Sequence, residues 1–168
     1  MIETELGNLR RSHYSDELSA SMDGTSVTVM GWVLTVRGHG NISFATVRDK
    51  NGDLSIVAKK GDCPDEIREK ISSLKAHSSV AIVGNIKSSE KAPSGFEIIP
   101  TELRVFSEVS KIPPFEPTTK TVKNIDTRLE VRPIDLRRNI LQHVFKTRSL
   151  VLKSIRDYFN GQNFVEIN

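Results

Sequence analysis

The stretch ISFATVRDKNGDLSIVA, residues 42–58, places one short turn between two runs of β-forming side chains. Asn51-Gly52 is a strong hairpin signal, because this pair accepts positive φ at both central positions of a tight turn. The sequence therefore predicts two antiparallel strands, one starting at Ile42 and one covering residues 53–59.

The first of these strands poses a question about Phe44. Alternation puts Phe44 on one face with Thr46 and Arg48, and puts Ala45 and Val47 on the other. Ala45 and Val47 can fill a core by themselves. Phe44 is then either a core residue in a sheet buried on both faces, or an aromatic ring turned outward toward a partner.

The neighbouring segments extend the pattern to five strands. The other strands are expected at residues 27–37, 79–87 and 95–106. Gly31 predicts a bend or bulge in the first of them, and Pro100 predicts an interruption in the last. A helix is expected at residues 64–75, where Pro64 suits the first turn and apolar residues recur at helical spacing.

Three strands, a helix and two further strands fit within about 80 residues. This order is typical of a mainly β, five-stranded Greek-key barrel of the OB-fold type, which binds its ligand on strands two and three and the flanking loops. A small α+β sandwich is the alternative, since the sequence does not prove that the barrel closes.

The C-terminal part has a different character. Residues 111–121 hold three prolines and predict a stiff linker. Residues 139–160 predict a long amphipathic helix, with Asn139 as its cap and Gly161 as its stop. The expected domains are 1–108 (barrel), 109–138 (Pro-rich and basic hinge) and 139–168 (first helix and start of a truncated catalytic domain). The final residues, Phe164 to Asn168, are expected to begin a strand that has nothing to pair with in this chain.

Composition excludes several classes of protein. No apolar run approaches the length of a bilayer span, and the polar N-terminus does not resemble a signal peptide. Cys63 is the single cysteine, and the four histidines are scattered, so neither a disulfide framework nor a metal site is expected. We therefore expect a cytoplasmic protein without contact to a membrane.

Charge is unevenly distributed along the chain. Residues 120–157 carry a net charge of +6, whereas residues 1–119 carry −2. A basic C-terminal third beside a nearly neutral body indicates two functional parts, although solvated charge explains the pattern equally well.

Three segments together carry a resemblance to a known family. GWVLTVRGHGNISFATVRDKNG, DTRLEVRPIDLRR and YFNGQNFVEIN resemble the N-terminal anticodon-binding region of aspartyl-tRNA synthetases, most closely the archaeal type. The asparaginyl and lysyl enzymes of the same class II subgroup are similar. The segment from Arg128 to Arg138, followed by a helix and NFVEI, is the most specific part of the resemblance.

The resemblance implies a parent enzyme that joins aspartate to tRNA(Asp) with ATP and magnesium. Whether it also uses tRNA(Asn) is left open by the sequence. The same resemblance implies a homodimeric parent, and a chain that lacks the catalytic motifs and needs no cofactor of its own. An excised N-terminal region is favoured over a short paralogue. The alternatives are a free-standing OB-fold module for single-stranded nucleic acid, an asparaginyl-tRNA synthetase fragment, and a structural dimerisation fragment.

The resemblance also implies which residues contact the anticodon loop. Phe44 would stack on the central anticodon base, and Arg37 would make a polar contact. By parity, Arg37 is expected to share a face with Val33 and Thr35. Alternatively, Phe44 is a core residue and Arg37 is a solvated cation at the end of a strand.

Three further residues complete the expected site. Ser55 stands where the family usually has a Gln, and a hydroxyl cannot present the paired donor and acceptor of an amide. Lys59 could substitute for it or attract the phosphates. Arg48 lies on the Phe44 face, but Arg48-Asp49 could equally form a structural ion pair.

Several other features are expected to be structural. Trp32 is assigned to the core with Leu34 and Val36. The arginines of residues 128–138 are expected to pair with neighbouring carboxylates more than with tRNA phosphates. The apolar face of the 139–160 helix needs a cover, which the family provides with its catalytic domain.

Overall fold

The computed structural model describes residues 7–111, 113–118 and 123–167. The chain divides into two compact units, Met1–Ser110 and Lys111–Asn168. Each unit is described by itself. The three-part division expected from the sequence stays a prediction.

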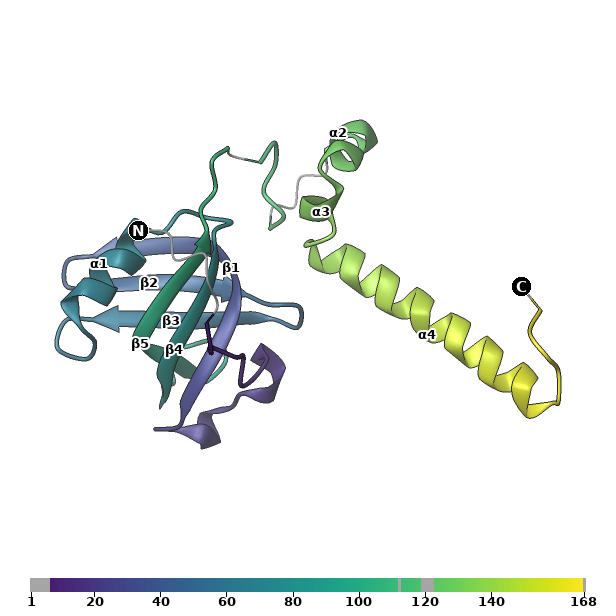
Figure 1. Cartoon of the computed structure of the whole chain (residues 1–168), viewed down its shortest axis with the longest axis horizontal. Helices are drawn as coiled ribbons and strands as arrows, with labels where there is room; N and C mark the ends of the chain where they lie inside the picture. The colour runs from purple at the N-terminus through teal and green to yellow at the C-terminus, as the bar shows by residue number, and fades with distance from the viewer. Residues whose placement is uncertain (1–6, 112, 119–122, 168) are drawn as a thin grey trace. The chain divides into compact units, whose positions relative to one another are not determined.

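The first unit is a closed five-stranded barrel with the strand order β1-β2-β3-β5-β4 (Figure 1). Its strands are β1 (Ser26–His39), β2 (Ile42–Arg48), β3 (Asp53–Lys59), β4 (Ser79–Ser88) and β5 (Phe96–Ser107). Neighbouring strands are antiparallel except β3 and β5, which pair in parallel at Ile56 and Ile98. The barrel prediction is confirmed, and the α+β sandwich is excluded.

One helix, α1 (Asp65–Ser73), connects β3 to β4 and contacts β2 and β5. Its residue Ile71 is fully buried in the core. Two short 3-10 helices, η1 (Ser15–Glu17) and η2 (Ala20–Met22), precede the barrel. The core is filled by aliphatic side chains from all five strands, among them Val29, Val33, Val47, Leu54, Ile56, Val80, Ile82 and Ile98.

A β-bulge in β1 corrects the predicted facing of this strand. Val33 pairs with Val47 and Thr35 pairs with Thr46, so Leu34 is an extra residue that β2 does not match. The alternation of side chains between the two faces of the sheet is therefore interrupted at Leu34. As a result, Val33 and Thr35 point to opposite sides of the sheet. Trp32 precedes the bulge and is 36% exposed, so its assignment to the core is wrong.

Gly31 predicts a bend or bulge, but the bulge lies at Leu34 and Gly31 instead allows a close approach of the backbone of β2. A Cβ at this position would lie 2.3 Å from the carbonyl oxygen of Arg48, a distance that no side chain tolerates. Near Pro100 the pairing of β4 with β5 shifts register between Val83 and Gly84. The expected interruption is thus an irregularity within one continuous strand.

The β2–β3 hairpin forms as predicted, but its turn differs. Neither Asn51 nor Gly52 has a positive φ. The carboxylate of Asp49 instead accepts hydrogen bonds from the backbone N–H groups of Asn51 (2.7 Å) and Gly52 (3.0 Å). The side chain that precedes the turn satisfies its amides, so the backbone does not need the left-handed region.

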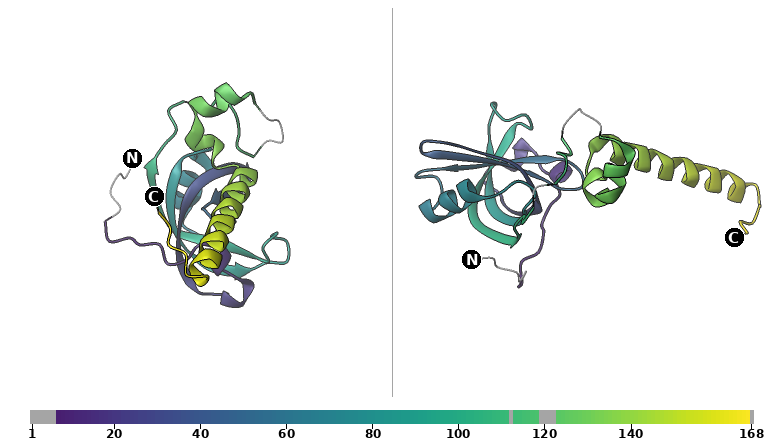
Figure 2. Two further views of the ribbon diagram at one scale, coloured as in Figure 1. Left: turned by 90° about the vertical axis from the view of Figure 1, so that its right-hand side faces the viewer. Right: turned by 90° about the horizontal axis from the view of Figure 1, so that it is seen from above.

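The second unit contains α2 (Ile125–Glu130), α3 (Arg132–Asp135) and α4 (Asn139–Gly161) (Figure 2). The long helix matches the prediction and includes Gly161, but Arg138 occupies the N-cap position rather than Asn139. Residues 164–167 form no strand, which is consistent with the expectation that a strand starting here has nothing to pair with in this chain. Among the described residues, no helix has the length and apolar character needed to cross a membrane.

Candidate nucleic-acid interface

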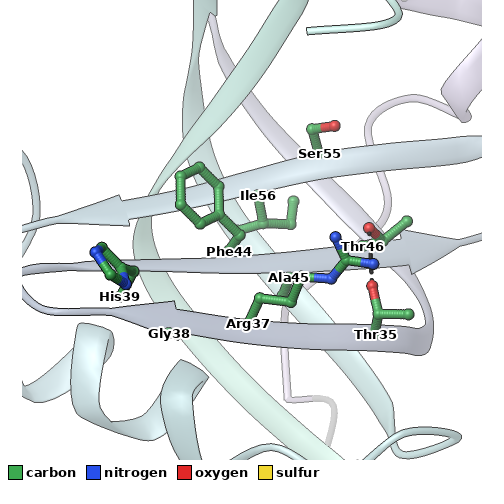
Figure 3. A pocket seen from close by; sticks show the side chains of 9 residues that line it. All are labelled: Thr35, Arg37, Gly38, His39, Phe44, Ala45, Thr46, Ser55 and Ile56. Atoms are coloured by element: carbon green, nitrogen blue, oxygen red, sulfur yellow. Dashed lines mark hydrogen bonds between the residues drawn. The ribbon is translucent and has the colours of Figure 1, made fainter.

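The outer face of β1, β2 and β3 carries a cavity of about 510 Å³. Figure 3 shows its side chains, which come from three adjacent strands. The lining residues are Thr35, Arg37, Gly38, His39, Phe44, Ala45, Thr46, Ser55 and Ile56. Three of the five residues predicted for the site, Arg37, Phe44 and Ser55, meet here.

Phe44 is turned outward. Its neighbours Ser43 and Ala45 are each 2% exposed and point into the barrel, whereas Phe44 is 42% exposed. The alternative that Phe44 belongs to the core is therefore excluded. An exposed ring on a sheet offers a flat apolar surface on which a nucleic-acid base can stack, worth about 1–3 kcal/mol per base.

Arg37 lies directly beside Phe44, because the two residues pair across β1 and β2. The bulge at Leu34 puts Arg37 on the outer face with Thr35, so the expectation that it shares a face with Val33 is wrong. The side chain is exposed, and within residues 7–111, 113–118 and 123–167 it forms no ion pair. Its planar fork of donors remains available for a phosphate or a base edge.

Three hydroxyl groups occupy adjacent positions across the same face. Thr35 pairs with Thr46, and Thr46 pairs with Ser55. The Thr35 hydroxyl donates to Thr46 Oγ1 at 3.3 Å. Ser55 therefore lines the cavity as predicted, whereas the contributions of Thr35 and Thr46 were missed.

The sequence holds a signal for both of these threonines. Thr46 is two residues from Phe44 and had been placed on its face, so the same alternation could have assigned it to the site. Thr35 is two residues from Arg37 and is expected on its face, so alternation could have assigned it as well. His39 was also missed; it lies near the end of β1 that leads into the Gly40 turn.

Arg48 and Lys59 do not line the cavity. Arg48 pairs with Asp53 at the base of the hairpin, with Nη2 donating to Oδ2 at 2.7 Å, and this hydrogen bond raises the pKa of the guanidinium. The suggested Arg48–Asp49 pair is not formed, because Asp49 bonds to Ser15. Lys59 is exposed and pairs with Ile42 across the hairpin.

In the second unit, one buried carboxylate organises the arginine-rich segment. Asp135 is fully buried and lies near Arg128 (3.0 Å), Arg132 (2.6 Å) and Arg138 (3.8 Å). Burial raises the pKa of Asp135, but the bonds from Arg128 and Arg132 outweigh it and hold the pKa below its usual range. The interpretation of this segment as a network of ion pairs is confirmed for these residues.

The described residues include no group of three or more His, Cys, Asp or Glu side chains that could hold a metal ion. The cavity offers several kinds of contact through its side chains. It combines a flat ring, a guanidinium and several hydroxyls, which suits binding of a splayed base with its adjoining phosphate.

Two family models match the chain in succession. Residues 27–106 match the OB-fold nucleic acid binding domain, and residues 124–168 match the tRNA synthetases class II (D, K and N). The first segment contains every residue that lines the cavity, and the second contains α2, α3 and α4.

Individual relatives cover almost the whole chain. An aspartate–tRNA(Asp/Asn) ligase of Methanocaldococcus jannaschii is 43% identical over 95% of the chain and 36% of that protein. The ligase with the same name from Methanothermobacter thermautotrophicus is 44% identical over 97% of the chain and 37% of that protein. The chain thus spans about a third of the length of these curated relatives.

Solved structures agree with the fold of the chain. The asparaginyl-tRNA synthetase of Pyrococcus horikoshii superposes with a TM-score of 0.82 at 27% identity, covering 100% of this chain and 38% of that one. With its two segments matched in succession and relatives along at least 95% of its length, the chain belongs to the class II tRNA synthetases (D, K and N) and carries their OB-fold nucleic acid binding domain.

Proposed function

We propose that the barrel binds the anticodon loop of tRNA(Asp) on behalf of an aspartate–tRNA ligase. The observation that carries this proposal is the outward ring of Phe44 in a cavity shared with Arg37 and Ser55. Phe44 stacks on the central anticodon base, Arg37 contacts its phosphate or edge, and Ser55 makes a polar contact. Lys59 attracts the phosphates, and Arg48 supports the hairpin from which Ser55 projects.

The substrate range includes tRNA(Asn). The curated relatives are named aspartate–tRNA(Asp/Asn) ligases, which supports this wider range. The middle letter of the codons for Asp and Asn is the same, so both anticodons present uracil at their centre. A site built around the central base alone cannot separate the two tRNAs.

The whole enzyme, in this proposal, is a cytoplasmic homodimer that activates aspartate with ATP and magnesium and passes the aspartyl group to the tRNA. The present chain contributes recognition of the tRNA. Free-standing binding of single-stranded nucleic acid is the competing function. The match of residues 124–168 to class II synthetases favours the ligase.

The test is a titration of the chain with anticodon stem-loops of tRNA(Asp), tRNA(Asn) and an unrelated tRNA. Phe44→Ala removes the stacking surface, and we expect it to weaken binding by about 1–3 kcal/mol, roughly five- to 150-fold. Phe44→Tyr keeps a ring and should bind like the wild type. Phe164→Ala, at an exposed Phe outside the barrel, is the matched control.

Two results would contradict the proposal. Equal affinity for all three stem-loops would end the claim of tRNA specificity and favour a general single-strand binder. Unchanged affinity of the Phe44→Ala variant would end the claim of stacking.

A further inference from the structure

The hydroxyls of Thr35, Thr46 and Ser55 form a row across the three strands that line the cavity. Neighbouring strands are about 4.8 Å apart, so the row extends over roughly 10 Å. Phe44 lies two residues before Thr46 on the same face, which separates their Cα atoms by about 7 Å. A base that stacks on Phe44 can therefore direct its polar edge toward Thr46.

The internal hydrogen bond of the row gives Thr46 a direction. Because Thr35 donates to Thr46 Oγ1, an acceptor site of the Thr46 hydroxyl is occupied and its own proton is left to donate. Thr46 is consequently set up as a donor toward the cavity. Arg37, whose guanidinium lies on the same side of the Phe44 ring in Figure 3, offers donors only.

A site rich in donors selects base edges that carry acceptors. Uracil and guanine present a carbonyl oxygen where cytosine and adenine present an amino group. An amino group placed against Thr46 meets a hydroxyl with one acceptor position already filled by Thr35, and the Thr46 proton must then turn away from the base. A carbonyl oxygen accepts that proton directly, so it makes the better contact.

We infer that Thr46, oriented by Thr35, is a specificity-determining residue that selects a keto base over an amino base on the Phe44 ring. The inference rests on the proposed function, because it requires a base at this position. Ser55 completes the row on β3, where its hydroxyl adapts as donor or acceptor to the next polar atom of the base. Selectivity for the base thus resides in the row of hydroxyls. It does not require a glutamine amide at position 55.

The experiment measures the affinity of the full chain for one stem-loop with a GUC anticodon and for the same RNA with cytosine as the central base. We expect the wild type to prefer uracil by about three- to tenfold, in line with the net contribution of one hydrogen bond. Thr46→Val keeps the shape of the side chain but removes the hydroxyl, and should abolish this preference. Thr46→Ser keeps the hydroxyl and should retain it.

Two further variants sharpen the test. Thr35→Val leaves Thr46 in place but removes its orienting donor, so it should reduce the preference by about twofold or more with little change in stability. Thr101→Val is the matched control, since it deletes a hydroxyl that bonds to the Val83 carbonyl on β4. Thr101 does not line the cavity, and its loss should leave the preference intact.

The results separate this inference from the proposed function. If Phe44→Ala weakens binding while the wild type does not distinguish the two RNAs, the stacking site stands and the selective role of Thr46 is overturned. The same holds if Thr46→Val binds, folds and keeps the full preference. If the wild type binds neither stem-loop, the proposed function itself is overturned.

Discussion

Ser55 stands where the resemblance to aspartyl-tRNA synthetases predicts a glutamine. Its half-buried hydroxyl lines the cavity on β3, opposite Thr46. A hydroxyl makes one directional contact, whereas an amide presents a donor and an acceptor side by side. Position 55 therefore sets how strongly the site can discriminate between bases.

We predict that Ser55→Gln increases discrimination at the central anticodon base. An amide that makes a bidentate contact contributes about 1–3 kcal/mol of discrimination, so the ratio of affinities for uracil and cytosine should rise about tenfold. The ratio is measured with the paired stem-loops, and Ser55→Ala serves as the control without a polar group. A Gln variant with the same ratio as the Ala variant would show that position 55 does not face the base.

Single residues also show how far the sequence alone can predict the site. Phe44 and Ser55 lie on short, regular strands, so simple alternation places both correctly. Alternation also keeps Arg37 with Thr35 on the outer face. The bulge at Leu34 interrupts it, so Val33 and Trp32, which precede the bulge, lie on the faces opposite to those expected. The bulge itself has no local signal, because Leu34 is an ordinary strand residue.

At the scale of elements, the β2–β3 hairpin is held by the segment that precedes the barrel. Asp49 is buried and accepts hydrogen bonds from the Ser15 backbone and hydroxyl at 2.7 Å each. Arg11 and Lys50 both lie over the ring of Tyr14, at 4.3 and 4.0 Å from its centroid. No local pattern predicts these contacts, since Ser15 is 34 residues from Asp49 in sequence.

We predict that Asp49→Asn destabilises the barrel by about 1–3 kcal/mol at neutral pH, because it removes a charged, buried acceptor shared by the donors of Ser15, Asn51 and Gly52. Burial raises the pKa of Asp49, but the bonds from Ser15, Asn51 and Gly52 outweigh it and lower the pKa. This contribution is therefore fully present above the unfolded pKa of about 3.9 and is lost as the pH falls through the folded pKa. Urea unfolding at pH 7 and pH 3 should show a larger loss of stability in the wild type than in the variant.

Asp23→Asn provides the comparison for this element. Asp23 also lies in the N-terminal segment, and its Oδ1 accepts a hydrogen bond from the backbone N–H of Ser88, at the end of β4, at 2.7 Å. Unlike Asp49, Asp23 is exposed. We expect Asp23→Asn to lower the free energy of unfolding by less than Asp49→Asn does. Equal losses, or an Asp49→Asn variant whose acid sensitivity matches the wild type, would contradict the role assigned to Asp49.

At the scale of the whole molecule, the two units differ in what they expose. The barrel buries its aliphatic residues, and the order of its elements was sufficient to predict it. Helix α4 leaves a row of apolar side chains exposed, among them Ile140, Val144, Val151, Ile155 and Phe159. The periodicity of the sequence predicts the helix and its apolar face. It does not predict which segment or partner packs against that face.

The charge distribution leads to the last prediction, which concerns salt. Residues 1–119 carry a net charge of −2, so RNA binding to the barrel depends on stacking and a few local cations rather than on a broad positive field. With two or three phosphates near Arg37 and Lys59, the logarithm of the association constant should fall against the logarithm of the salt concentration with a slope of about −1.4 to −2.

Lys59→Ala should make this slope shallower by about 0.7. Lys87→Ala removes a cation of β4 that lies 3.5 Å from Asp62, and should leave the slope unchanged. A slope steeper than about −4 for the wild type would instead place many phosphates on the protein, which requires the basic arginines of the second unit to bind the RNA as well.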